Sequence, residues 1–356
     1  MTRLTRERLI EILEACRGVR AGVLGDFNLD AYWYAEMTLS QLSRETPLFP
    51  RPVVRETYSP GGAANVAWNL AALSPAQVEA FSVFGFDWRG DLLTAILKDF
   101  GINLASVMFE KEHLTPLFGK IILMAQENEQ EDARLDFTND RPLTLEQERR
   151  LMEKLEDRLP GLDVLVIADY LDNGVVTERV RRRLNHLAKE NPDLVWVVDS
   201  RQHVGDFRAM VLKPNQVEAA GMFFPERPYP SIQPEELVEA AMTQNRATGK
   251  PLVVTMGERG CLLIDKGESV RLPAVLHPPP VDTVGAGDTF LSALATCLAA
   301  RAEAWEACLV ANLAAGVTVK CLRVTGTASA EQIIQEYDAL PRAVNAVEWS
   351  EWIGER

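Results

Sequence analysis

The chain has 356 residues, 47% of them hydrophobic and 25% charged, a composition typical of a globular protein with a sizeable core. Its 37 basic and 51 acidic side chains give a net charge of −14, and such a field repels the phosphates of nucleic acid and of anionic lipid. We therefore expect neither nucleic acid nor a membrane surface as a partner. A nucleotide can still bind where backbone N–H groups, a cation or a local basic residue reverse the field.

Cysteine usage and the amino-terminal segment both favour a cytoplasmic location. No C-x-x-C pair occurs among the five cysteines, so buried reduced thiols are expected rather than a disulfide or zinc role. The segment MTRLTRERLIEILEACRG is charged and amphipathic and has no apolar signal-peptide core. No stretch approaches the ~18 apolar residues that a membrane span requires.

In chain order, helical patterns alternate with short apolar runs. An opening amphipathic helix carries Leu9, Ile10, Ile12 and Leu13 and is capped by Gly18. Runs typical of buried strands follow at residues 21–24, 81–84, 164–168, 194–198, 211–212 and 252–255. Helical stretches are expected at residues 61–73, 88–100, 145–158, 175–190 and 234–248, and the chain after residue 281 is mostly helical. This alternation predicts an α/β fold with a mainly parallel sheet covered on both faces.

Polar residues stand at the ends of several predicted strands. They are Asp26, Asp169, Asp199 and Asn215. Ligands of open α/β sheets bind at the carboxyl ends of the strands, so we expect these side chains to converge on one cleft. A single aspartate after a strand is usually a turn or helix cap, but the repetition favours a functional site.

Two segments, residues 32–58 and 105–137, interrupt the alternation with extended patterns. They are consistent with one small accessory sheet that excludes water during group transfer, and equally with ordinary edge strands. The expected organisation is an amino-terminal helix (1–19), one main domain (20–340) containing these segments, and a carboxyl-terminal tail (341–356).

The segment VDTVGAGDTF, residues 281–290, is the most informative. Gly285 and Gly287 permit a tight turn whose free N–H groups, at the start of a helix, suit a transferring phosphoryl group. Asp288 lies in the first turn of that helix, where a carboxylate can accept the proton of an alcohol. The alternative is that Asp288 is only a helix N-cap. A Walker-type phosphate loop and a G-x-G-x-x-G dinucleotide motif are both absent from the sequence.

Two further segments are consistent with a small polar ligand. In PGGAANVAWNLAAL, Gly61 and Gly62 permit close approach to the backbone and Asn65 falls on the first helical turn, although the same residues could simply start a packed helix. In GDFNLD, Asn28 and Asp30 share a face if the chain is extended, and the carboxylate suits a sugar diol.

Together these motifs resemble a known family. GGAANVAWNLAAL and DTVGAGDTF, preceded by the strand and GDFNLD, resemble the signatures of the PfkB, or ribokinase-like, carbohydrate kinases over residues 20–335. Within the family, GDFNLDAYWY, SRETPLFP, ARLDF and ANLAAGVTV are most similar to the heptose 7-phosphate kinase domain of bifunctional ADP-heptose synthesis proteins.

The resemblance implies a ribokinase-like three-layer fold with a small β lid made of the two extended segments. It implies ATP and Mg²⁺, with K⁺ as a possible further ion, and Asp288 as catalytic base beside an anion hole of Gly285, Ala286 and Gly287. The implied sugar contacts are Asn28, Asp30, Gly61, Gly62 and Asn65. Asn215 and Glu218 match the N-x-x-E motif that organises Mg²⁺ and the phosphates through water. The implied nucleotide contacts are Asn215, Glu218, Thr255, Gly257, Gly260 and Asn312, and Asp282 matches a potassium position.

The sequence also departs from the heptose kinases. Ile122 stands where they usually carry a basic residue, which leaves Lys120 and Arg134 as candidate contacts for a substrate phosphate. No H-x-G-H motif of a nucleotidyltransferase occurs, so at most the kinase half is expected. The expected reaction is transfer of the ATP γ-phosphoryl group to a sugar or sugar phosphate, with D-glycero-D-manno-heptose 7-phosphate as a candidate acceptor.

Alternative acceptors are ribose, fructose, 2-keto-3-deoxygluconate or a nucleoside. A sugar- or nucleotide-binding sensor without catalysis is the alternative from another class. Relatives often dimerise through the lid, and exposed Tyr32, Trp33 and Tyr34 would suit the interface of such a homodimer. Packing within the lid explains aromatic side chains in a strand equally well.

Overall fold

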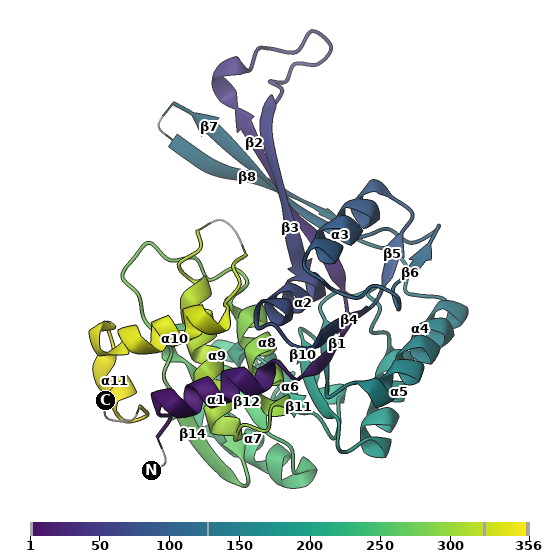
Figure 1. Ribbon diagram of the computed structural model, residues 1–356. Coiled ribbons are helices and arrows are strands. Elements are labelled where there is room, and N and C mark those ends of the chain that lie inside the picture. Colours follow the sequence, from purple (N-terminus) through teal and green to yellow (C-terminus); the bar gives the residue numbers. More distant parts are fainter. Residues whose placement is uncertain (1–2, 127, 323–324, 354–356) are drawn as a thin grey trace.

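The computed structural model describes residues 3–126, 128–322 and 325–353. Its centre is an eight-stranded sheet of order β14-β13-β12-β11-β10-β9-β1-β4 (Figure 1). The parallel strands are β1 (Arg20–Gly25), β4 (Gln77–Phe81), β9 (Val164–Asp169), β10 (Val195–Ser200), β11 (Val211–Leu212) and β12 (Leu252–Thr255). An antiparallel hairpin of β13 (Cys261–Asp265) and β14 (Glu268–Leu272), which the sequence patterns did not predict, completes one edge.

Helices cover both faces of this sheet. One face packs against α1 (Arg6–Cys16), α2 (Ala63–Ala72), α3 (Trp88–Asp99), α8 (Ala286–Ala299), α9 (Ala304–Thr318) and α10 (Ala330–Ala339). The other packs against α4 (Leu145–Arg158), α5 (Glu178–Glu190), α6 (Gln216–Phe223) and α7 (Pro234–Thr248). In β9, Val164 and Val166 enter the first core while Leu165 enters the second, because successive side chains of a strand point to opposite faces. The three-layer α/β fold with a mainly parallel sheet is confirmed.

Local signals locate most helix ends where the sequence predicts them. Helix α4 spans residues 145–158 as expected, since Thr144 and Gln147 form a capping box at its start. Helix α7 also has its expected bounds and ends at Gly249 in the left-handed conformation. The expected cap of α1 was wrong: Arg17 is its C-cap and keeps right-handed helical angles, so no left-handed glycine is needed at Gly18.

The expected strand at 81–84 was also wrong. Residues 77–81 form β4, whereas β5 (Val83–Gly85) leaves the main sheet and pairs with β6 (Met108–Glu110). The first residues of β4 were not predicted as a strand, because the polar side chain of Glu79 interrupts the apolar pattern. Its carboxylate is nonetheless buried, bonded to Ser106 and paired with Arg158.

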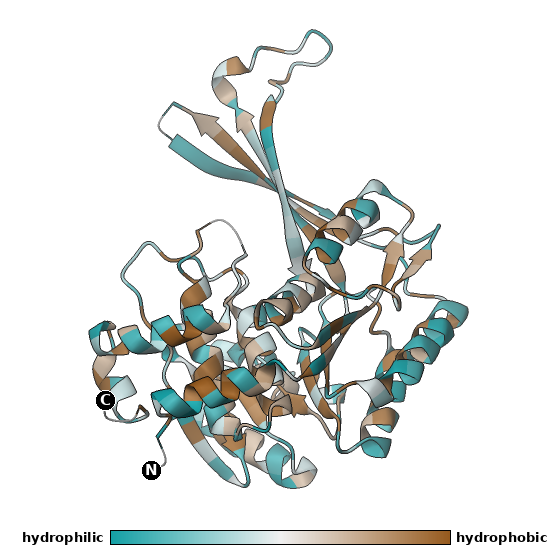
Figure 2. Cartoon of the chain, in the orientation of Figure 1, coloured by the Kyte–Doolittle hydropathy of each residue, from teal (hydrophilic) through white to brown (hydrophobic). Residues whose placement is uncertain are grey.

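The two extended segments meet in a second, four-stranded sheet of order β3-β2-β7-β8. It consists of β2 (Phe27–Glu36), β3 (Val53–Gly62), β7 (Leu117–Ala125) and β8 (Asn128–Phe137) and projects from the main body (Figure 1). Residues 105–116 do not belong to it, since β6 pairs elsewhere. β8 is the hydrophilic edge, whereas β7 beside it is more hydrophobic (Figure 2). Residue 127 of the expected segment lies outside the described residues.

The carboxyl-terminal segment is more than a tail. Helix α11 (Ala346–Ser350) buries Trp349, whose indole N–H donates to the carbonyl of Ala274 at 2.9 Å. The backbone of Leu4 bridges to Ile353, so the two ends of the described chain lie together. Across the described ranges, no helix combines the length and hydropathy that a membrane span requires.

Candidate active site

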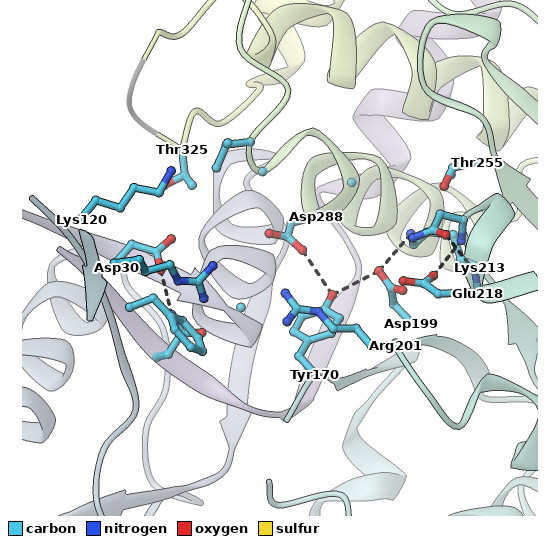
Figure 3. Close-up of a pocket in the computed structure, with 18 of the residues that line it drawn as sticks. Asp30, Lys120, Tyr170, Asp199, Arg201, Lys213, Glu218, Thr255, Asp288 and Thr325 are labelled. Carbon is cyan, nitrogen blue, oxygen red and sulfur yellow. Dashed lines mark hydrogen bonds and ion pairs between the residues drawn. The ribbon is translucent and has the colours of Figure 1, made fainter. Parts of the chain in front are cut away.

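A cavity lies between the carboxyl ends of the parallel strands and the base of the second sheet (Figure 3). Of the four polar strand-end residues, Asp199 and Asn215 line it. Asp26 and Asp169 are buried and do not line it. The full lining is Asn28, Asp30, Tyr32, Gly62, Phe118, Lys120, Arg134, Tyr170, Asp199, Arg201, Lys213, Asn215, Glu218, Thr255, Val284, Gly285, Gly287, Asp288 and Thr325.

Asp288 lies near the middle of this cavity, in the first turn of α8 (Figure 3). The N-cap of α8 is Gly285, so the alternative that Asp288 is the N-cap was wrong. Its carboxylate accepts hydrogen bonds from Asn65 Nδ2 at 2.7 Å and from the Tyr170 hydroxyl at 3.2 Å. Burial raises the pKa of Asp288 to about 6, against the opposing effect of the Asn65 hydrogen bond. A carboxylate with such a pKa is a suitable proton acceptor near neutral pH.

The turn before α8 requires its first glycine. Gly285 has φ of 80°, a left-handed conformation that L side chains rarely adopt. Gly285 and Gly287 line the cavity beside Asp288, at the positive end of the helix dipole. The N–H of Ala286 instead donates to the carbonyl of Thr283 at 3.2 Å, so this amide of the expected anion hole is engaged within the turn.

The second sheet contributes the polar groups expected to hold a sugar. Asn28 Nδ2 donates to Asp30 Oδ1 at 3.0 Å, and both side chains line the cavity. Burial, and next the charge of Asp288, raise the pKa of Asp30 to about 7. Gly61 does not line the cavity, but it makes room for the side chains that do, because a Cβ there would lie 2.1 Å from Asn28 Nδ2 and 2.4 Å from Asp30 Oδ1. Asn65 does not line it either and acts through its bond to Asp288.

Lys120 and Arg134 are cross-strand partners on β7 and β8, and both line the cavity. Lys120 lies on the side of Asp30 (Figure 3), and the positive charges of both residues favour ionisation of the Asp30 carboxyl. Lys120 Nζ lies 3.3 Å from Glu131 Oε2, and Arg134 Nε lies 2.6 Å from Asp136 Oδ1. Both pairs are partly exposed, so each cation can exchange its partner for an anionic ligand at low cost.

The opposite side of the cavity holds a buried ion pair that the sequence patterns did not single out. Lys213 Nζ lies 2.9 Å from Asp199 Oδ2, and both side chains are less than 10% exposed. Burial by itself lowers the pKa of Lys213, but the charge and hydrogen bond of Asp199, together with the charges of Glu218 and Asp288, more than offset it, so the pKa is raised. Tyr170 and Arg201 were missed as well, although each directly follows a strand whose last residues were noted. Position after a strand was the available signal.

Asn215 and Glu218 are close to this ion pair and form a capping box at the start of α6. Asn215 Oδ1 accepts from the N–H of Glu218 at 3.0 Å, and Glu218 Oε2 accepts from the N–H of Asn215 at 2.8 Å. Burial, and next the charge of Asp199, raise the pKa of Glu218 to about 7. A divalent cation would favour the ionised carboxylate, and carboxylate oxygen is the donor that hard cations prefer. Asn215 and Glu218 therefore offer oxygen donors of the kind that a hydrated divalent cation binds.

A second, more apolar cavity adjoins the first and shares Thr255 and Gly287 with it. Its lining includes the remaining expected nucleotide contacts, Gly257, Gly260 and Asn312. Asp282 lines neither cavity. Its Oδ1 accepts the N–H of Val284 at 3.0 Å and its own N–H donates to Val319, so the structure places it beside the turn rather than in the site.

Comparison with known proteins identifies relatives of the whole fold. The model of the pfkB family carbohydrate kinases matches residues 27–331. The bifunctional protein HldE of Geotalea uraniireducens is 32% identical over 337 residues, covering 94% of this chain and 66% of the relative. HldE of Coxiella burnetii is 33% identical over 313 residues, covering 85% of this chain and 60% of the relative. The chain thus spans 60–66% of the length of these relatives.

Solved structures show the same fold at lower identity. Phosphofructokinase-2 from Escherichia coli, solved with fructose-6-phosphate, has a TM-score of 0.67 and 21% identity, with 90% of this chain and 98% of that chain covered. Ribokinase from Arabidopsis thaliana, solved with ribose and ATP, has a TM-score of 0.63 and 17% identity, with the same coverage.

Proposed function

The chain belongs to the pfkB family of carbohydrate kinases, and we propose that it transfers the γ-phosphoryl group of ATP to a hydroxyl group of a sugar or sugar phosphate. One observation carries the proposal: Asp288, a carboxylate with a pKa near 6, lies between the polar side chains of the second sheet and the cationic groups at the strand ends. This arrangement suits a sugar hydroxyl on one side of Asp288 and the nucleotide phosphates on the other.

In the proposed reaction, the sugar oxygen attacks the γ-phosphorus and its proton passes to the Asp288 carboxylate. A phosphorus–oxygen bond to the sugar forms, the bond to the β-phosphate oxygen breaks, and ADP leaves. Lys213 and Arg201 line the cavity, and on the side that we assign to the phosphates they would stabilise negative charge together with the positive end of α8. Mg²⁺, held through water by Asn215 and Glu218, would neutralise charge on the phosphates.

The apolar cavity is the proposed site of the nucleoside. Thr255 lines both cavities, so a nucleotide that crosses at this point has its base among apolar side chains and its phosphates near Asp288. Gly257, with φ of 59°, and Gly260, with φ of 79°, shape the turn there. Asn312, buried on α9, would donate to or accept from the base. The proposed K⁺ role of Asp282 rests on the family resemblance.

We further infer that the second sheet acts as a lid and that heptose 7-phosphate is the acceptor. Lys120 and Arg134 support a phosphate on the sugar, because both line the cavity and both carry a positive charge that acts on Asp30. Ile122, which stands where a basic residue is usual, is buried in β7 and does not line the cavity. Lys120 and Arg134 would therefore bind this phosphate without a third cation from β7.

The proposed activity is tested by measuring ADP formation with ATP and Mg²⁺ against a panel of heptoses, pentoses, ketoses and their phosphates. Phosphorylation of one panel member, detected as a new phosphate ester by mass spectrometry, supports the kinase proposal and identifies the acceptor class. Binding of a sugar without ADP formation would instead favour a sensor. Omission and replacement of K⁺ in the same assay tests the proposed role of Asp282.

The Lys120→Ala variant tests whether the acceptor carries a phosphate. Loss of a charge-assisted hydrogen bond to a phosphate is expected to raise KM for a sugar phosphate about 10- to 100-fold. The KM for the corresponding unphosphorylated sugar should change little. Lys111→Ala, at an exposed position that does not line the cavity, is the matched control. Equal effects of Lys120→Ala on both substrates would contradict the assignment.

A homodimer through the lid remains a proposal, with different residues from those first expected. Tyr34 is buried, and Tyr32 and Trp33 are only partly exposed, so the expectation of three exposed aromatic side chains was wrong. The exposed large apolar side chains of the lid are Leu39, Leu42, Leu48, Phe49, Val53 and Val54 on the β2–β3 side and Leu135 and Phe137 on β8. Sedimentation equilibrium of the wild type and of a Leu48→Glu, Phe49→Glu variant tests whether they mediate assembly. Escherichia coli phosphofructokinase-2 has been described in a tetrameric inhibited form.

A further inference from the structure

The hydroxyl group of Tyr170 lies between two carboxylates of the active-site cavity (Figure 3). It is 3.2 Å from Asp288 Oδ1 and 3.2 Å from Asp199 Oδ2. Asp199 Oδ2 also forms an ion pair with the ammonium group of Lys213, and Asp288 Oδ2 accepts a hydrogen bond from the amide nitrogen of Asn65. These contacts form one continuous chain from Lys213 to Asn65, and Tyr170 is its middle link.

A phenol carries a single hydrogen, so it donates to only one of the two carboxylates at a time. Asp199 is already compensated by the nearby ammonium group of Lys213. When Asp288 is ionised, a hydrogen bond from the phenol therefore stabilises Asp288 more than it stabilises Asp199. After Asp288 takes up a proton, the preference reverses and the hydrogen can turn to Asp199.

We propose that Tyr170 is a positioning residue for the catalytic base, whose hydroxyl donates to Asp288 before proton transfer and to Asp199 after it. This inference rests on the proposed kinase function. Tyr170 keeps its own proton throughout, and the proton of the sugar hydroxyl passes only to Asp288. The phenol thus stabilises the ionised form of the base and fixes the orientation of its carboxylate toward the acceptor.

The position of Tyr170 is set from behind by Asp26. The buried carboxylate of Asp26 accepts the backbone N–H groups of Tyr170, Leu171 and Val175, each at 2.8 Å. Gly174 makes this approach possible, because a Cβ there would lie 2.2 Å from Asp26 Oδ1. The loop that carries the phenol is therefore anchored before any ligand binds, as preorganisation of a catalytic group requires.

The other charged groups around Asp288 come from four places in the fold. Asp30 on β2 and Asp199 on β10 oppose its ionisation, whereas Lys213 after β11 favours it. Arg201, which follows β10, lies over the Tyr170 ring at 5.4 Å. The Tyr170 and Asn65 hydrogen bonds both lower the pKa of Asp288. Removal of the phenol oxygen deletes one of these stabilising contacts and leaves both neighbouring carboxylates in place.

The Tyr170→Phe variant tests the proposal through the pH profile of kcat. We expect the acid limb of the profile to move upward by about one pH unit, because the ionised base loses a hydrogen-bond donor. The decrease in kcat should accordingly be about tenfold below the midpoint and should diminish at alkaline pH. KM for ATP and for the sugar should stay within about twofold, since Tyr170 is assigned to the base rather than to binding.

The matched control is Tyr337→Phe. Tyr337 is also a buried tyrosine, but its hydroxyl donates to the carbonyl of Leu4 at 2.8 Å and it does not line the cavity. This variant should leave the acid limb in place. An unmoved acid limb in Tyr170→Phe, with kcat lowered equally at every pH or not at all, would overturn the proposal.

A second measurement reports on Asp288 without turnover. The stability difference between a protein with Asp288 and its Asp288→Asn counterpart changes with pH as Asp288 titrates in the folded state. Measured in the wild-type and in the Tyr170→Phe background, this change should begin at the same pH in both but continue to a higher pH, and so become larger, in the latter. Identical curves in both backgrounds would refute the role of Tyr170, even if no sugar in the panel is phosphorylated. If the pH dependence differs between the two backgrounds but no sugar is phosphorylated, the role of Tyr170 toward Asp288 stands and only the kinase function is refuted.

Discussion

Replacement of Asp288 by asparagine is expected to lower kcat for sugar phosphorylation by about 10²–10⁴-fold, the usual contribution of a general base. The amide keeps the shape of the side chain, and Asn65 and Tyr170 can still hydrogen-bond to it. KM values should therefore change far less than kcat. Steady-state kinetics with the acceptor found in the panel provide the measurement.

The control for this substitution is Asp140→Asn. The side chain of Asp140 is 88% exposed and does not line the cavity, so the same chemical change there should leave kcat unaltered. If Asp288→Asn retains more than about a tenth of wild-type kcat, Asp288 is not the base, because a positioned base contributes more than this.

The same substitution is expected to stabilise the protein at neutral and alkaline pH. The pKa of Asp288 is raised from 3.8 to about 6 by burial, so ionisation of this group costs folding free energy. That cost is absent below the unfolded-state pKa, grows as the pH rises between the two values, and reaches its full size above about 6. The shift corresponds to at most about 3 kcal/mol. Thermal unfolding of both proteins across this pH range tests the sign.

Much of the fold was predictable because its signals are local. Capping residues such as Thr144 and the apolar strands that alternate with helices are visible in a single stretch of sequence. The strand β4 was misjudged for a non-local reason. Glu79 is polar in sequence but buried in the structure, where Arg158 and Ser106 from distant segments satisfy its carboxylate.

The candidate site divides in the same way. Asp288 and the glycines before it were found because a Gly-x-Gly-Asp turn before an apolar helix has a local meaning. Tyr170 and Lys213 were not predicted, because a single tyrosine or lysine after a strand occurs in many local settings and does not by itself indicate a site. Their importance comes from Asp199 and Asp288, which lie 29 and 118 residues from Tyr170 in the sequence. The packing of β9, β10 and β11 side by side, together with the start of α8 at their carboxyl ends, brings these groups together.

The second large effect is expected from Lys213→Met, which should lower the free energy of unfolding by about 3–5 kcal/mol. Lys213 and Asp199 form a nearly buried pair at 2.9 Å. Methionine fills most of the space of the lysine but leaves Asp199 as an uncompensated charge in a cavity that also contains Glu218 and Asp288. Urea denaturation at neutral pH provides the measurement, and Lys266→Met is the control. Its partner Glu303 lies at a similar 3.0 Å, but both side chains are exposed, so the loss there should stay below about 1 kcal/mol.

A double variant separates the charge of Lys213 from its packing. If the loss arises from the charge left on Asp199, then Asp199→Asn should restore part of the stability of Lys213→Met, although Asp199→Asn alone removes the partner of a buried ammonium group. The two substitutions should therefore be non-additive by about 0.5–3 kcal/mol. Strict additivity would mean that the pair is not coupled and that methionine destabilises the site through its shape. Neither outcome restores catalysis, because the double variant still lacks the cation that we place beside the transferring phosphoryl group.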